Sequence, residues 1–157
     1  MRQLIFGALL ALALSGTAQT TSRETAATKY DCGANLYFRY EESQGTSAAR
    51  SKLLTQAAGC LEESYKLQPH AQTAYLLSIV YAHLRKKEKA AEYAQSALDG
   101  KPKLEPQFLE GARKILSWAK TVKEPNGTVI AVGADTPPVV TVPKNSIDAS
   151  ADQKPPP

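Results

Sequence analysis

Residues that commonly bind metals or perform catalysis are scarce in this 157-residue sequence, which contains only two cysteines and two histidines. No CxxC or HxxxH spacing occurs, so we expect no metal site. No glycine-rich phosphate loop occurs either, and we expect no cofactor. His70 and His83 lie apart, and no Ser, Asp or Glu is spaced around either one as a catalytic triad would require. The sequence therefore argues against an enzyme.

The sequence also lacks an apolar run long enough to span a membrane. The run from Leu4 to Leu14 has eleven residues, whereas a spanning helix needs about 20. Arg2 precedes this run and small residues follow it as far as Ala18, which is the order of a secretory signal peptide. We predict a signal peptide over residues 1–18 that is cleaved near Ala18, rather than a retained membrane anchor. The mature protein is then expected to be periplasmic or secreted, as in a bacterial envelope, with no stable membrane insertion.

Charge of one sign is not concentrated along the chain. The formal net charge is +4 at pH 7, and removal of residues 1–18 would lower it to +3 because only Arg2 is lost. Nucleic-acid-binding proteins normally show a concentrated basic face, so we expect no nucleic-acid partner. The basic run Arg85–Lys89 falls at a predicted turn. It is either a solvated loop that complements a helix C-terminus or a contact for an acidic partner.

Proline is rare in the middle of the chain and abundant at its end. Only Pro69, Pro102 and Pro106 lie between residues 28 and 121, and the other seven of the ten prolines follow. Because proline excludes a regular helix, we predict an extended, poorly ordered tail over residues 122–157. Two segments of this tail, TVIAV and VVTV, have strand-forming composition. They support an alternative, in which the tail docks on a partner's sheet edge.

The middle of the chain has the apolar spacing of helices. Apolar residues recur with a period of 3.6 rather than 2 over about residues 27–43, 48–67, 71–85 and 88–98, and in a fifth segment that begins near Pro106. The third segment is apolar on most of its circumference, which is typical of a helix packed between neighbours. Gly100 is expected to close the fourth helix in a left-handed conformation. We predict an all-α domain over residues 27–121, preceded by a linker at 19–26.

Residues 71–102 match part of a known repeat pattern. When Tyr81 is aligned to the final tyrosine of W-x2-L-G-x2-Y, the pattern's Leu, Ala, small residue and Pro fall on Leu77, Ala90, Ala97 and Pro102. The residues at 74, 78 and 94 depart from the pattern's Trp, Gly and aromatic residue. On these positions the stretch resembles a tetratricopeptide repeat (TPR), a helix–turn–helix unit. Leu77 and Tyr81 would then fill the crease between two helices, and small residues would let the helices approach closely.

The preceding unit resembles the same repeat only at its end. Pro69 and Pro102 are 33 residues apart, but Gly45 lies twelve residues before Ala57, where the pattern would place a turn about five residues before it. This first hairpin is therefore degenerate and longer. We predict antiparallel helical hairpins stacked as a short TPR-like solenoid, with the fifth helix acting as a C-terminal cap.

The two cysteines fit this first hairpin. Cys32 lies 13 residues before Gly45 and Cys60 lies 15 residues after it, so the two would be nearly level in antiparallel helices. In an oxidising compartment such a pair is a disulfide candidate, whereas in the cytosol two free thiols would be expected. We predict a Cys32–Cys60 disulfide that stabilises the fold by about 3 to 4 kcal/mol.

The resemblance implies a function in protein–protein interaction. In TPR proteins a concave face, lined mainly by the first helix of each repeat, receives an extended peptide or a partner segment. On the matching repeat this face would include Gln72, Tyr75, Ile79 and His83. Tyr75 and Ile79 have an alternative role in packing against the first hairpin, and Trp118 is either an edge packing residue or an exposed anchor. We expect an exported scaffold module with a protein or peptide partner. The alternative is a small secreted enzyme or inhibitor on an unrelated helical bundle.

Overall fold

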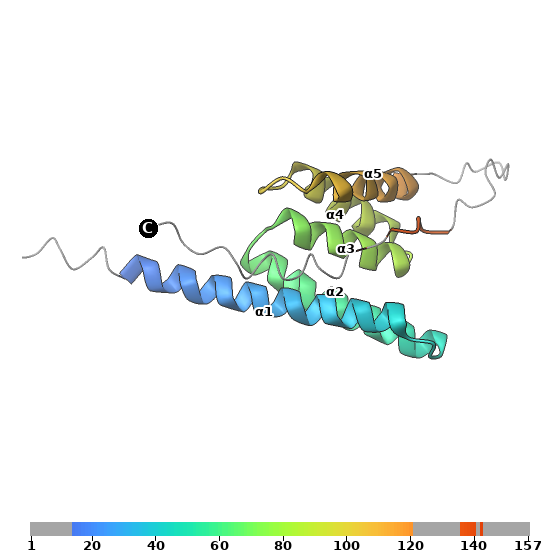
Figure 1. The fold of residues 1–157 in the computed structure, drawn as a ribbon, viewed down its shortest axis with the longest axis horizontal. Helices are drawn as coiled ribbons and strands as arrows, with labels where there is room; N and C mark the ends of the chain where they lie inside the picture. Colours follow the sequence, from blue (N-terminus) through green and yellow to red (C-terminus); the bar gives the residue numbers. More distant parts are fainter. Residues whose placement is uncertain (1–13, 121–135, 141, 143–157) are drawn as a thin grey trace, which may run out of the picture.

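The computed structural model describes residues 14–120, 136–140 and 142 of the chain. Within these residues there are five α-helices and no strand (Figure 1). The helices are α1 (Leu14–Glu42), α2 (Ser47–Leu67), α3 (Ala71–His83), α4 (Lys87–Asp99) and α5 (Pro106–Lys120). The all-α prediction is confirmed for this part of the chain. Most of the predicted signal peptide and most of the predicted tail lie outside the described residues.

Helix α1 begins earlier than the apolar periodicity indicated. It starts at Leu14 rather than near Ala27, so residues 19–26, which were expected to form a linker, are helical. Their threonines and serine are weak helix formers, and packing against α2 supports the helix at this point. Ala26 is buried, and its carbonyl accepts a hydrogen bond of 2.8 Å from the Ser64 hydroxyl of α2.

Helices α1 and α2 form a long antiparallel hairpin (Figure 1). Thr46 caps the start of α2, where its hydroxyl accepts a hydrogen bond of 3.3 Å from the Ala49 amide. A disulfide joins Cys32 of α1 to Cys60 of α2, with the two Cα atoms 5.9 Å apart, and the predicted pairing is therefore confirmed. The bond lies about midway along α2 and so ties the centre of the hairpin rather than its open end.

Helices α3 and α4 form a second, shorter hairpin over residues 71–99. Every residue of α3 from Thr73 to Ala82 is buried, which confirms that this helix packs between neighbours. Leu77 and Tyr81 are buried, as predicted for the crease between the two helices. The small residues expected to allow close approach have no exposed surface; they are Ser78, Ala90, Ala94 and Ala97.

The reversal between α3 and α4 depends on a left-handed residue that the sequence did not predict. Arg85 has φ of 57°, its amide donates to the Ala82 carbonyl, and the Lys86 amide donates to the Tyr81 carbonyl, both at 3.0 Å. This pair of hydrogen bonds is a Schellman motif. The left-handed cap predicted at Gly100 is wrong, because its φ is −69°.

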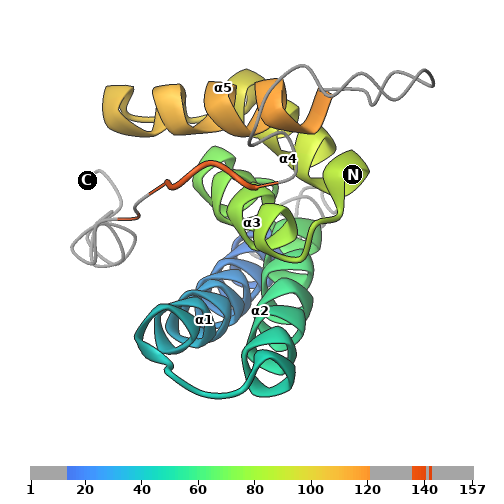
Figure 2. The same cartoon turned by 90° about the vertical axis from the view of Figure 1, so that its right-hand side faces the viewer.

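Helix α5 covers α3 and α4 on the side away from the first hairpin (Figure 2). It begins at Pro106, as predicted, because proline suits the first helical position. Phe108, Ile115 and Trp118 are buried on its inner face. Trp118 is thus a packing residue and not an exposed anchor. A single hydrophobic core extends from the α1–α2 hairpin through α3 to α5.

Candidate interaction cleft

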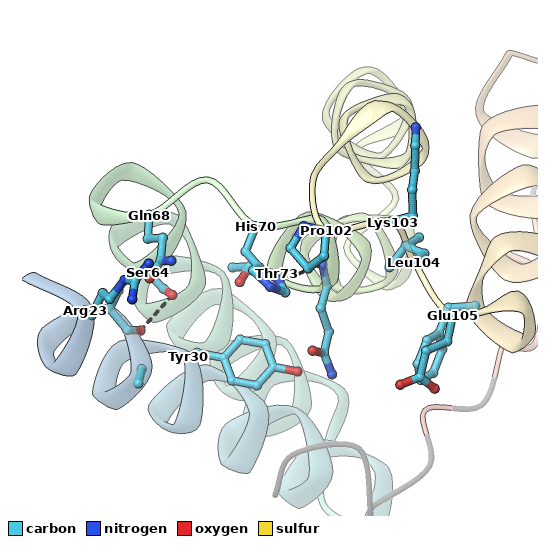
Figure 3. Close-up of a pocket in the computed structure, with 14 residues that line it drawn as sticks. Arg23, Tyr30, Ser64, Gln68, His70, Thr73, Pro102, Lys103, Leu104 and Glu105 are labelled. Carbon is cyan, nitrogen blue, oxygen red and sulfur yellow. Dashed lines mark hydrogen bonds between the residues drawn. The ribbon is translucent and has the colours of Figure 1, made fainter. Parts of the chain in front are cut away.

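A cleft of about 540 Å³ opens where helices α1, α2, α3 and α5 converge with the loop before α5 (Figure 3). Helix α1 contributes Arg23 and Tyr30, α3 contributes Gln72, and α5 contributes Phe108. The C-terminal end of α2 and the loop of residues 102–105 complete the walls. The volume falls within the range of ligand-binding pockets, about 300–1,000 Å³.

The floor of the cleft is apolar. Tyr30, Leu104 and Phe108 each expose less than a tenth of their surface. Burial, with a smaller contribution from the charge of Asp31, raises the pKa of Tyr30 to about 12. The Tyr30 hydroxyl is therefore protonated at neutral pH and can donate a hydrogen bond into the cleft. Such a floor suits an apolar group that carries a hydrogen-bond acceptor.

The rim of the cleft is polar. Arg23, Lys103 and Glu105 are exposed there. His70 caps the start of α3, where its Nδ1 accepts a hydrogen bond of 3.3 Å from the Gln72 amide. Burial lowers the pKa of His70 below its usual 6.5, so the imidazole is neutral at pH 7. The charged side chains of the rim are thus two cations and one carboxylate, which favours a segment that is acidic or uncharged over a basic one.

The four residues predicted for the partner face do not form one surface. Gln72 is partly exposed and lines the cleft, whereas Tyr75 and Ile79 are each 2% exposed. The ring of Tyr75 lies 5.3 Å from that of Phe108, so Tyr75 packs against α5 in addition to the core, and not only against the first hairpin as the alternative supposed. These two side chains belong to the core in this structure.

His83 lies at the opposite end of α3, eleven residues and so about 16 Å from Gln72. Its Nδ1 is 3.2 Å from the Tyr40 hydroxyl of α1, and the Arg50 guanidinium of α2 lies 4.5 Å from the centre of the Tyr40 ring. Burial, together with the nearby Arg50 charge, lowers the pKa of His83. This group joins the first hairpin to α3, which gives His83 a structural role.

The basic run Arg85–Lys89 is only partly a loop, because α4 begins at Lys87. Lys89 lies 2.8 Å from the Glu62 carboxylate of α2, which also accepts a hydrogen bond of 2.5 Å from the Tyr81 hydroxyl. Burial alone would raise the pKa of Glu62, but the hydrogen bonds from Lys89 and Tyr81 lower it overall. Tyr81 and Tyr93 stack at 5.6 Å beside this pair. The run therefore helps to hold α4 against α2.

No family model, curated protein or solved structure matches this chain.

The cleft is therefore interpreted from its own geometry. Among the described residues no group of three or more His, Cys, Asp or Glu side chains is placed to hold a metal ion. Within the same residues, no helix has both the length and the apolarity needed to cross a membrane. The cleft has an apolar floor with hydrogen-bonding groups around it, and this arrangement can bind a segment of polypeptide.

Sequence reasoning identified Gln72 but missed most of the cleft. Leu104 gave a usable signal, because it is a single apolar residue in a short polar loop between Pro102 and Pro106. Such a residue usually reaches a core, and Leu104 is 7% exposed. No comparable signal in the sequence indicated that Tyr30 and Arg23 line a cleft, since their place beside it depends on how far α1 extends past α2.

Proposed function

We propose that this chain is an exported protein-interaction module in which TPR-like hairpins, stacked as a short solenoid and capped by α5, hold a segment of a partner protein. In this interpretation α1, α3 and α5 are the first helices of successive units. The observation that carries the proposal is that α1, α3 and α5 all line the same cleft, to which α2 contributes only Ser64 and its C-cap Gln68. A TPR-like module would receive its partner on the face that these helices share.

The burial pattern of residues 71–102 supports the proposed resemblance. Leu77 and Tyr81, which the resemblance assigns to the crease between two helices, are buried, and the small residues aligned to the repeat have no exposed surface. The Cys32–Cys60 disulfide is compatible with an extracellular or periplasmic location. Export and interaction are thus consistent proposals for one molecule.

Site-specific photo-crosslinking tests this function. A benzoyl-phenylalanine placed at Lys103, on the cleft rim, is expected to crosslink one partner in the extracellular or periplasmic fraction of the producing cells. The same group at Thr55, an exposed position on α2 outside the cleft, serves as the control. The partner is then identified by mass spectrometry and purified.

Affinity for that purified partner is the second measurement. The double variant Arg23→Glu, Lys103→Glu reverses both rim cations, and we expect it to weaken binding by about tenfold or more. Lys52→Glu, Arg113→Glu makes the same charge change at exposed positions outside the cleft and should leave the affinity almost unchanged. Equal crosslinking from Lys103 and Thr55, or equal affinity of the two double variants, would contradict the proposal.

A further inference from the structure

Part of the chain's own C-terminal region packs against an apolar surface of α3 and α5 beside Tyr75 and Gly111, and we call this surface the groove. Residues 136–140 and 142, coloured red, run beside α3 and below α5 in Figure 2. Val140 and Val142 are partly buried and pack against the hydrophobic core. Val139, between Pro138 and Val140, is 91% exposed.

This alternation is what an extended segment produces when one side faces a surface. Successive side chains of an extended chain point in opposite directions, so residues 138, 140 and 142 share a side and residue 139 has the other. Pro137 and Pro138 are both partly buried, so the alternation is seen over residues 138–140 and at 142 and does not extend to Pro137. The segment carries no charged side chain over residues 136–142, so it can lie on an apolar surface without desolvating an ion.

Gly111 of α5 is the point at which the segment comes closest to the helix. A Cβ added there would lie 2.8 Å from Cγ1 of Val140 and would also overlap the Tyr75 hydroxyl of α3. A Cβ at this position would therefore require the Tyr75 or Val140 side chain to move, and glycine avoids this. Glycine weakens a helix interior relative to alanine, and its presence in the middle of α5 keeps space for Val140 and Tyr75 together.

We propose that the groove between α3 and α5 around Gly111 binds an extended, uncharged segment rich in proline and valine, and that residues 136–140 and 142 of the same chain occupy it. The inference deepens the proposed interaction function and rests on it in one respect only. A partner segment that uses this groove must have the same chemistry and must displace these residues. The occupancy itself requires no partner.

When a segment of the same chain occupies the groove, any free peptide that competes for it binds with a weaker apparent affinity. A tethered segment acts at an effective concentration on the order of 1 mM. The apparent affinity of a free peptide is lowered by the fraction of molecules whose groove is closed. Opening the groove should therefore reveal a site that the full chain conceals.

The experiment uses the full chain and a fluorescent peptide with the sequence of residues 134–144, ADTPPVVTVPK. Val140→Asp, Val142→Asp should release the segment, and the peptide should bind this variant with an apparent Kd at least about tenfold lower than for the wild type. Val139→Asp is the control, because it adds a carboxylate, one against the two of the double variant, at a side chain that already faces solvent. It should behave as the wild type does.

A second measurement shows whether the variants remain folded and where the segment lies. An NMR contact between the Val140 methyl groups and Gly111 Hα is expected in the wild type and in Val139→Asp, and should be lost in the double variant with helicity unchanged. Adding Gly111→Ala to the double variant should abolish peptide binding. Equal peptide affinity for the wild type and the double variant, or absence of the contact in the wild type, would overturn the inference.

Sedimentation separates this arrangement from exchange between two copies. A dimer that becomes monomeric in Val140→Asp, Val142→Asp would mean that the segment docks on a second molecule, and the proposal would be wrong. The proposed function fails separately: if the groove opens as expected but no partner crosslinks at Lys103, the occupancy stands and the interaction function falls.

Discussion

Gly33 and Gly59 lie in the same hairpin but in opposite surroundings. A Cβ on Gly33 would overlap Cγ of Leu61 and would lie 2.8 Å from Cδ2 of the same side chain and 3.0 Å from the Ala57 carbonyl oxygen. A Cβ on Gly59 would meet no atom within 4 Å. Both glycines lie inside helices, so helix propensity favours alanine at both and only packing distinguishes them.

We expect Gly59→Ala to stabilise the protein and Gly33→Ala to destabilise it. The first change should raise the free energy of unfolding by about 1 kcal/mol, the usual difference between glycine and alanine in a helix. The second should lower it by about 1 to 3 kcal/mol, because the added methyl group overpacks the space beside Leu61. Urea unfolding of the two variants beside the wild type measures both. A change of the same sign at the two positions would contradict the close approach of α1 and α2 at Gly33.

At the scale of the element, the turn after α3 shows how a helix can end without glycine. Arg85 adopts φ of 57°, a conformation that costs most non-glycine residues about 1 kcal/mol or more. The Schellman hydrogen bonds of Arg85 and Lys86 and the packing of α4 against α3 hold it there. The following residue, Lys86, has φ of −91°, which any residue adopts.

Arg85→Gly should therefore raise the free energy of unfolding by about 0.5 to 1 kcal/mol. Lys86→Gly is the matched control on the neighbouring residue. It should lower the same quantity slightly, because glycine there relieves no left-handed backbone, increases the entropy of the unfolded chain and removes an ammonium that lies 5.9 Å from the centre of the Tyr81 ring. Thermal unfolding followed by circular dichroism is sufficient for both. A loss of stability in Arg85→Gly as large as that in Lys86→Gly would show that the backbone at residue 85 is not left-handed.

The helices themselves were largely predictable, because their apolar spacing is a local property. The starts of α2, α3 and α5 agree with caps or prolines visible in the sequence, such as Thr46 and Pro106. The left-handed cap predicted after the fourth helix at Gly100 was wrong and the left-handed Arg85 after α3 was not predicted, since the rule that favours glycine is statistical. Gly100 instead allows a close approach, because a Cβ there would lie 3.0 Å from the Ala71 Cβ.

The site was less predictable than the helices. Tyr75 and Ile79 lie one turn apart and away from the crease. From the sequence pattern alone, these two residues could belong either to a free face of the helix or to a buried one. Their burial follows from the position of α5, whose Phe108 ring lies beside Tyr75. That position depends on packing between elements distant in the sequence, and a periodicity carries no information about it.

At the scale of the whole molecule, the disulfide is a covalent cross-link between α1 and α2 in addition to the turn that joins them. It closes a loop with a sequence separation of 28 residues. Removing it in Cys32→Ser, Cys60→Ser should lower the free energy of unfolding by about 3 to 4 kcal/mol in the chain-entropy model. This loss is a large share of the total free energy of unfolding of a typical domain, which is roughly 5 to 15 kcal/mol.

Urea unfolding of the double serine variant measures this loss, and reduction of the wild-type protein should reproduce it. If the loss is below about 1 kcal/mol, the α1–α2 hairpin is held by its packing alone. Peptide mapping without reductant that finds both cysteines as free thiols in exported protein would contradict the bond itself.

The position of Trp118 has a spectroscopic consequence. It is the only tryptophan of the chain, and it is buried in α5 with the Lys87 ammonium of α4 5.3 Å from its ring. Its emission therefore monitors the α4–α5 contact, whereas ellipticity at 222 nm averages over all five helices and thus includes the cross-linked hairpin. Without any added dye, a comparison of the two optical signals shows whether the α4–α5 contact is lost before, with or after the helices as a whole.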